Sequence, residues 1–252
     1  MPIKAITIDF HNTLARCDRW FELEVRALVP EVLAALGPAH GVNVDGALLE
    51  RTRHAYRELR AGIIASGDEQ DALVGTLATL ELVGVALPTA RVAEAIDGLM
   101  RAALAEVRPM PGAMEAVRAL RDRGYRCAII SSAVHHPFLE WTIDRFGLGD
   151  AFATIVTSAS SGYYKSRPEI YTTTLQGLGI APDEAIHVGD SYRFDVQGAR
   201  RAGLRAIWYA DTVAALAQPD NEADATVADL ATLPQVIATL DGGGARRGWW
   251  RR

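Results

Sequence analysis

Five short apolar runs, each bounded by turn-forming residues, constrain the fold of this 252-residue chain more than any other feature. They cover residues 3–9 (IKAITID), 125–131 (YRCAIIS), 152–158 (FATIVTS), 184–190 (EAIHVGD) and 204–210 (LRAIWYA). The runs are rich in Ile and Val, and polar and apolar residues do not alternate strictly within them. That pattern is typical of strands that are buried on both faces of a parallel sheet.

Segments with helical periodicity lie between these runs, at residues 112–124, 136–147, 168–179 and 195–203. Each segment ends near a Gly, as the C-terminus of a helix often does. Strands that alternate with helices favour right-handed crossover connections. The chain is therefore predicted to form an α/β fold with a doubly wound parallel sheet.

Residues 16–107 interrupt this alternation, because no convincing strand occurs there. Four helices are expected instead, at residues 19–36, 46–66, 70–84 and 89–107, with breaks that are rich in Gly and Pro. An all-helical insert directly after the first strand is most simply a cap over the strand ends. The expected domains are a core at 1–15 and 108–240, a helical cap at 16–107, and a flexible basic tail at 241–252.

The composition excludes several classes of partner. A net charge of −5 and a pI of about 5.7 predict no general attraction to nucleic acid or to anionic membranes. No apolar run is long enough to span a bilayer, and no signal peptide precedes the first strand. Cys17 and Cys127 are far apart in the sequence and are expected to be reduced thiols. These features predict a cytoplasmic monomer or homodimer without nucleic-acid partners or stable membrane association.

Candidate functional side chains follow the strand-like runs. Ligands of doubly wound sheets bind beyond the carboxyl ends of the strands, so Asp9, Ser131, Lys165 and Asp190 are expected to cluster there. Lys165 is one of two lysines among 26 basic residues, and the other, Lys4, is predicted to lie at the surface. A compact ammonium group such as that of Lys165 suits the binding of a phosphoryl group.

The order of these residues resembles the haloacid dehalogenase-like hydrolase superfamily. The matching features are Asp9-x-His11-x-Thr13, an apolar strand that ends in Ser131, then Lys165, and finally GDSYRFD with Asp190 and Asp195. The similarity continues through PGAMEAVRALRDRGYRCAIISS, YYKSRPEIY and HVGDSYRFDVQGARRAG. The resemblance implies a Rossmann-like core, with the insert in the position of the C1 caps of subfamily I.

The resemblance also implies the chemistry of the site. Asp9 would be the nucleophile, ionised at neutral pH, and would form an aspartyl intermediate that water later hydrolyses. Asp9, Asp190 and the backbone carbonyl of His11 would hold Mg²⁺, which prefers a few carboxylates together with phosphate oxygen. Asp195 would orient Lys165 or a water on the metal. Small phosphate monoesters are the implied substrates.

Further residues would hold the transferred group. Lys165 would neutralise its charge, and Ser131 would donate a hydrogen bond to it. Ser132 follows directly and is a second candidate, although the spacing from the apolar run favours Ser131. Thr13 is a further phosphate-binding candidate by its place in the first motif.

His11 departs from the family pattern. In phosphatases of this superfamily the residue two positions after the nucleophile is a second Asp, which acts as general acid and base. Histidine can act as acid or base near pH 7, but a nearby Mg²⁺ should lower its pKa and favour the neutral form. We therefore expect slow turnover of alkyl phosphates and faster turnover of substrates with good leaving groups. A space-filling role for His11 remains open.

Two other functions are compatible with these residues. A 2-haloacid dehalogenase would act through an ester on Asp9 and take a halogenated acid; such family members also lack the second Asp. They need no metal, however, and usually lack the acid at Asp190, so Asp190 and Asp195 favour phosphoryl chemistry. A non-catalytic family member that binds Mg²⁺ or phosphate is the second alternative.

The substrate cannot be read from the motifs. Arg53, Arg57 and Arg60 recur at helical spacing in the insert, where they would either bind a carboxylate or second phosphate or form a solvated helix face. His135 and His136 follow Ser131 and would lie either near the crevice or at the surface of a helix N-terminus.

Overall fold

The computed structural model describes residues 2–210 and 221–242, so most of the predicted basic tail lies outside the described residues. Six parallel strands form the main sheet: β1 (Ala5–Ile8), β4 (Arg126–Ser131), β5 (Thr154–Thr157), β6 (Ala185–Gly189), β7 (Arg205–Tyr209) and β8 (Ala225–Val227). Their spatial order is β5-β4-β1-β6-β7-β8. The predicted α/β fold with a parallel sheet is confirmed.

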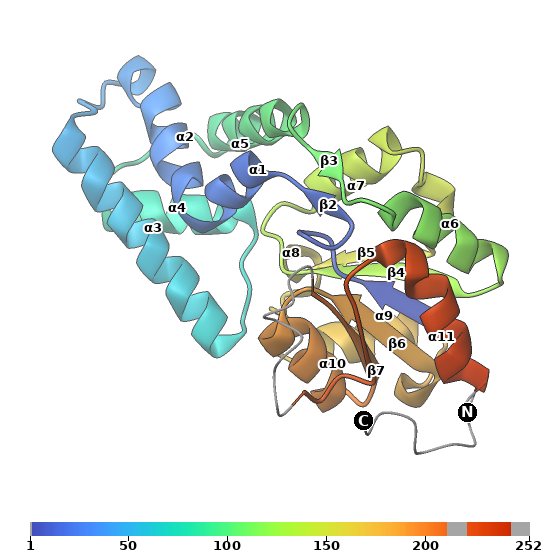
Figure 1. Cartoon of the computed structure of the whole chain (residues 1–252). Coiled ribbons are helices and arrows are strands. Elements are labelled where there is room, and N and C mark those ends of the chain that lie inside the picture. The colour runs from blue at the N-terminus through green and yellow to red at the C-terminus, as the bar shows by residue number, and fades with distance from the viewer. Residues whose placement is uncertain (1, 211–220, 243–252) are drawn as a thin grey trace.

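Helices cover both faces of this sheet (Figure 1). On one face lie α6 (Ala113–Asp122), α7 (His136–Arg145) and α11 (Leu233–Gly242); on the other lie α9 (Glu169–Leu178) and α10 (Gln197–Arg201). Ile6 and Ile8 pack into the core beneath the first group, whereas Ala5 packs into the core beneath the second. Successive residues of β1 thus point to opposite faces, and both faces are apolar because both are buried.

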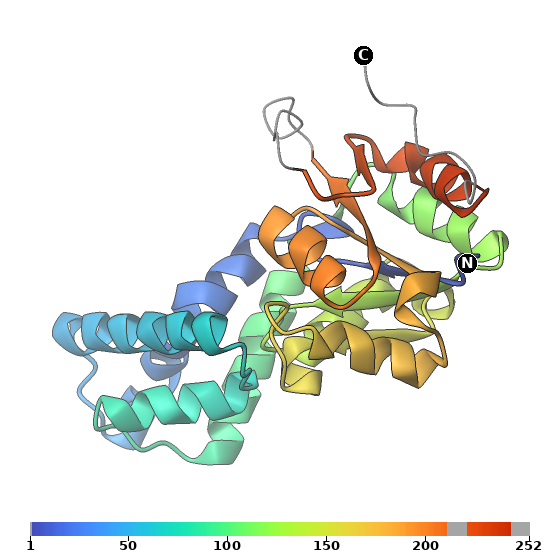
Figure 2. The same cartoon turned by 90° about the horizontal axis from the view of Figure 1, so that it is seen from below.

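The helical insert contains five α-helices, one π-helical turn and the 3₁₀ turn η2 (Pro38–His40). The helices and the π-helical turn are α1 (Asp18–Glu22), η1 (Leu23–Ala27), α2 (Leu28–Leu36), α3 (Gly46–Ser66), α4 (Ala72–Leu82) and α5 (Thr89–Leu104). In Figures 1 and 2 these helices lie to one side of the α/β core. Asp45 and Asp71 begin α3 and α4 because their side chains accept hydrogen bonds from Leu48 N and Val74 N.

Two short strands join the insert to the core. β2 (Ala15–Arg16) and β3 (Arg108–Pro109) pair antiparallel, so the chain enters and leaves the insert side by side. The expectation that 16–107 holds no strand was therefore wrong at Arg16. A two-residue strand carries no periodicity, and its pairing depends on a partner more than 90 residues away in the chain.

A second contact ties the insert to the core at the far end of α3. Tyr164 N donates to Gly67 O (2.9 Å), Glu69 N donates to Gly162 O (2.9 Å), and Ala72 N donates to Val134 O (2.8 Å). These bonds reach the loop after β4 and the segment that follows α8 (Ser158–Ser161). The insert is consequently held over the carboxyl ends of the strands at two separate places.

The remaining elements are short. They are the 3₁₀ turns η3 (Gly149–Ala151), η4 (Pro182–Glu184) and η7 (Leu230–Thr232), and the π-helical turn η5 (Tyr192–Val196). No helix of the described residues is long and apolar enough to cross a membrane. Cys17 and Cys127 are both buried and unpaired, which agrees with the prediction of reduced thiols.

Candidate active site

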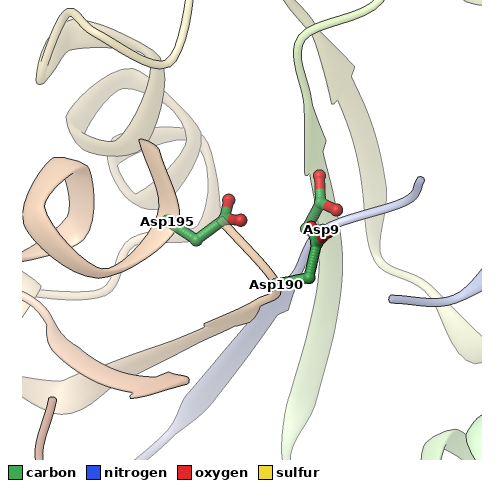
Figure 3. A group of neighbouring side chains, drawn as sticks. All are labelled: Asp9, Asp190 and Asp195. Atoms are coloured by element: carbon green, nitrogen blue, oxygen red, sulfur yellow. The ribbon is translucent and has the colours of Figure 1, made fainter. Parts of the chain in front are cut away.

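The candidate site lies where the strand order changes direction. β1 lies between β4 and β6, and Asp9 and Asp190 directly follow β1 and β6. Asp195 reaches toward both from the opposite side, out of η5 (Figure 3). Ligand oxygens of these three carboxylates all lie within 4.8 Å of one another. Ligand sites of doubly wound sheets occur at this type of switch point.

A tight turn after β1 aims Asp9 at the site. The carbonyl of Phe10 accepts hydrogen bonds from Leu14 N and Ala15 N (both 2.9 Å), which folds the chain back on itself. Asn12 has a φ of 60°, and its side chain hydrogen-bonds Asp190. Asn tolerates this left-handed conformation better than most residues. The sequence motif did not single out Asn12, although an Asn in a turn is the available signal.

Lys165 lies at the centre of the charged cluster and is 2% exposed. Its Nζ contacts the carboxylate of Asp9 and lies 2.6 Å from Oδ1 of Asp195. Burial acts to lower the pKa of Lys165, but the fields of Asp195 and Asp9 outweigh burial and raise it, so the ammonium stays charged. Lys165 N donates to the hydroxyl of Ser132 (3.2 Å), which holds the lysine segment against the loop after β4.

Both carboxylate oxygens of Asp195 form contacts within the protein. Its Oδ1 lies 3.1 Å from Nε2 of His187 as well as beside Lys165, and its Oδ2 accepts a hydrogen bond from Ser191 N (2.8 Å). Burial acts to raise the pKa of Asp195, but Lys165 overcomes this and the pKa is lowered. Both oxygens of Asp195 therefore have partners, and Asp9 and Asp190 are left as the carboxylates that could face a cation.

Asp9 and Asp190 have raised pKa values. Burial is the main cause for both carboxyls, and it raises the pKa of Asp9 to about 8 and that of Asp190 to about 6. The neighbouring carboxylates add to the shift, while Lys165 opposes it. The sequence predicts an ionised Asp9, but burial of the strand end makes ionisation costly unless a further positive charge enters.

His11 is packed among aromatic side chains. Its ring stacks on Phe21 with centroids 4.8 Å apart and an interplanar angle of 4°, and the centroid of Trp20 lies 5.3 Å away. Burial lowers the pKa of His11 to about 4, so the imidazole is neutral at pH 7. Its Nε2 is buried and has no hydrogen-bond partner among the described residues. Neither aromatic residue was identified from the sequence.

A cavity of about 500 Å³ opens at the cluster, between core and insert. The candidate residues from the sequence that line it are Asp9, His11, Arg57, Arg60, Ser131, Ser132, Lys165, Asp190 and Asp195. Thr13 is not among the lining residues; it is fully buried, and its hydroxyl has no partner within the described chain. Its role in phosphate binding stays a prediction.

The two histidines that follow Ser131 lie away from this cavity. His135 precedes α7, and its Nε2 lies 2.8 Å from Asp97 of the insert. His136 Nδ1 lies 3.1 Å from the hydroxyl of Thr157. Both rings therefore pack at the start of α7 and not in the cavity, but His135 is buried there, whereas the alternative from the sequence was a surface position.

Fold and site together define a doubly wound α/β protein with three carboxylates and a lysine at the switch point. Residues 3–203 match the family model described as haloacid dehalogenase-like hydrolase. The chain belongs to this family, as its motifs predicted, and is a hydrolase.

Named relatives include phosphatases. A glyceraldehyde 3-phosphate phosphatase of Pyrococcus abyssi is 27% identical over 208 residues, which cover 82% of this chain and 81% of that protein. The protein of the same name from Pyrococcus furiosus is 33% identical over 104 residues, 41% of this chain and 42% of that protein. Haloacid dehalogenase-like hydrolase domain-containing protein 3 of Homo sapiens is 31% identical over 218 residues, with 82% and 81% covered.

Solved structures share the fold. A HAD phosphatase from Thermococcus onnurineus has a TM-score of 0.66 at 23% identity, covering 93% of this chain and 98% of that one. A 2-haloacid dehalogenase from Pseudomonas syringae pv. Tomato DC3000 also has a TM-score of 0.66 at 23% identity, with 94% and 99% covered. At this identity the likeness shows the fold alone, and it does not separate the two activities.

Proposed function

We propose that the protein is a Mg²⁺-dependent phosphatase of small phosphate monoesters that acts through Asp9. The observation that carries this proposal is the position of Lys165, whose ammonium lies between Asp9 and Asp195 beside Asp190. The carboxylate proposed as the nucleophile, that of Asp9, is therefore in contact with the buried ammonium of Lys165. The relatives named as phosphatases support the same chemistry.

The donor set fits Mg²⁺. Asp9 and Asp190 offer hard carboxylate oxygens, and the backbone carbonyl of His11 is the third proposed ligand. The raised pKa values of both carboxyls reflect negative charge that is buried without sufficient compensation. A divalent cation would offset that charge. When bound, Mg²⁺ acts as a Lewis acid that polarises a phosphoryl oxygen.

In this proposal the reaction has two steps, and residues of this chain have a role in each. The carboxylate of Asp9 attacks phosphorus while the bond to the leaving oxygen breaks, which gives an aspartyl phosphate and releases the leaving group as an oxyanion that takes its proton from solvent water. Water then attacks the phosphorus, which releases phosphate and restores Asp9. Lys165 neutralises the non-bridging oxygens, Ser131 donates a hydrogen bond to them, and Asp195 holds Lys165 in place.

His11 would contribute little proton transfer in either step. A neutral imidazole with a pKa of about 4 has no proton to give to the leaving oxygen at pH 7. Departure of the leaving group would then depend on its own stability as an anion. The protein should prefer monoesters with good leaving groups, such as aryl or acyl phosphates.

The helical insert would serve as a cap over the active site. In this proposal the core comprises 1–15 and 108–240, and the cap comprises 16–107. The insert supplies much of the wall of the cavity, including Trp20, Phe21 and Arg57. The β2–β3 ribbon is the covalent connection about which the insert would move to admit substrate.

The deciding experiment measures phosphate release from p-nitrophenyl phosphate and halide release from 2-chloropropionate. Each substrate is tested with Mg²⁺ and with EDTA, and Asp9→Asn is the control. We expect phosphate release that requires Mg²⁺ and disappears in Asp9→Asn. Halide release that persists in EDTA would replace the proposal with the dehalogenase alternative.

A protein with neither activity would be tested for binding. Beryllium fluoride with Mg²⁺ mimics a phosphoryl group on a carboxylate, and it should protect the wild-type protein against thermal unfolding but not Asp9→Asn. Protection that requires Asp9 would favour a phosphatase with a narrow, untested substrate, and a protein without such protection would support the non-catalytic alternative.

A further inference from the structure

The structure separates the three arginines of α3, which the sequence alone could not distinguish. Arg53 pairs at the surface with Glu50, one turn earlier on the same helix. Arg60 is 7% exposed, and its guanidinium binds both oxygens of Glu69 at 2.5 and 3.2 Å. Both guanidinium groups are therefore already paired with a carboxylate.

Arg57 differs from both neighbours. It lines the same cavity as Asp9, and within the described part of the chain its guanidinium has neither an ion pair nor a hydrogen bond. The two other cations that line the cavity already have partners: Lys165 contacts Asp9 and Asp195, and Arg60 binds Glu69. An anion that enters from the insert side therefore meets Arg57 as an uncompensated cation.

The one acid of the insert among the described lining residues does not cancel this charge. Glu24 also lines the cavity, but it is 4% exposed, and both of its oxygens face Val134 N at 2.9 and 3.1 Å. Burial raises the pKa of Glu24 to about 8, so the carboxyl is mostly neutral at pH 7. The charged groups of the cavity are thus the cluster around Asp9 in the core, Arg60 with its partner Glu69, and the unpaired Arg57 in the insert.

The rest of the lining includes a large apolar and aromatic surface. The side chains that form it are Trp20, Phe21, Val25 and Ile64 from the insert, and Tyr164 and Phe194 from the core. A ligand that fills the cavity would meet the core cluster, hydrophobic and aromatic groups, and the guanidinium of Arg57.

We propose that Arg57 binds a second anionic group of the substrate, so that the preferred substrates are phosphate monoesters with a carboxylate or second phosphate beyond an apolar body. This inference rests on the proposed function, which places the phosphoryl group at Asp9 and Lys165. A guanidinium binds a carboxylate through two parallel charge-assisted hydrogen bonds, which gives both affinity and orientation.

The test compares 4-carboxyphenyl phosphate with 4-carbamoylphenyl phosphate, which have the same shape and differ in charge at the far end. The quantity measured is the ratio of kcat/KM for the carboxylate ester to kcat/KM for the amide ester. In Arg57→Gln we expect this ratio to fall about tenfold, mainly through KM, because binding is lost equally in ground and transition states. Arg53→Gln, one turn away and outside the cavity, should leave the ratio unchanged. An equal ratio in wild type and Arg57→Gln would overturn the inference.

A binding measurement separates this inference from the proposed function. If the wild-type protein hydrolyses neither ester, the phosphatase proposal fails, and affinities for the same two esters are measured by calorimetry with Mg²⁺ in Asp9→Asn. A preference of about tenfold for the carboxylate ester that disappears in Asp9→Asn/Arg57→Gln would support the role of Arg57. Equal affinities for both esters would overturn it.

Discussion

At the scale of single residues, His11 shows how surroundings decide chemistry. The sequence predicts a neutral imidazole, with Mg²⁺ as the cause, whereas in the structure burial against Phe21 and Trp20 already lowers the pKa to about 4. The aromatic contacts also support the space-filling role that the sequence left open. Burial therefore makes His11 a poor proton donor at neutral pH.

Replacing His11 by Asp should restore a proton donor and acceptor at this position. We expect turnover of an alkyl phosphate to rise by at least tenfold, while turnover of p-nitrophenyl phosphate changes much less because its leaving group needs no proton. Phosphate release from both substrates by wild type, His11→Asp and His11→Asn measures this. The Asn variant controls for loss of the ring, and an unchanged alkyl-phosphate rate in His11→Asp would contradict the expectation.

At the scale of elements, the contact between β6 and η5 determines where Asp195 lies. A Cβ added at Gly189, the last residue of β6, would lie 2.2 Å from Cγ of Asp195. Only glycine lets the π-helical turn approach the strand this closely. The sequence showed a Gly before Asp190 but could not show which side chain occupies the space beside it.

Gly189→Ala should therefore displace Asp195 and loosen Lys165. We expect a loss of about 1–3 kcal/mol in the free energy of unfolding, together with a fall in phosphate release. Gly177→Ala is the matched control, because Gly177 lies in α9 with nothing within 4 Å of the added Cβ. That variant should be as stable as wild type or more stable. Thermal and denaturant unfolding measure both, and a fully stable Gly189→Ala would refute the close contact.

The predicted elements that were long and periodic are present in the structure. The five strand-like runs all became strands of the main sheet, and the helices of the insert lie within a few residues of their expected positions. β8 was missed because Ala225–Val227 is only three residues long and is not strongly apolar. The segment 195–203 was expected to be one helix, but it begins within a π-helical turn that local periodicity does not reveal.

At the scale of the whole molecule, Glu24 links the insert to the core. It lies in η1, and its carboxyl group meets the backbone N–H of Val134 in the loop after β4. Arg60 acts to lower the pKa of Glu24 and Glu69 acts to raise it, but burial dominates and sets it near 8. The association of insert and core is thereby coupled to pH.

This coupling predicts a measurable pH dependence of stability. The folded protein keeps a proton on Glu24 up to about pH 8, whereas the unfolded chain releases it near pH 4.5. Between these values the folded state binds more protons, so this group makes the free energy of unfolding fall as pH rises. Glu24→Gln should gain in Tm relative to wild type between pH 5 and pH 9. The half-exposed Glu22→Gln serves as control, and parallel Tm curves for wild type and Glu24→Gln would contradict the prediction.

The sequence by itself determined the five longer apolar strands, most of the helices, the order of the motifs and the family, because each depends on residues that are close together in the chain. Hydrophobic periodicity and strand-end acids can be recognised without knowing what packs against them. Only the tertiary structure decided that His11 is buried among aromatic rings, that both oxygens of Asp195 are occupied, and that Arg57 rather than Arg53 or Arg60 is uncompensated. Burial, pairing and pKa depend on groups that meet in space from distant parts of the chain, and for this reason local patterns could not predict them.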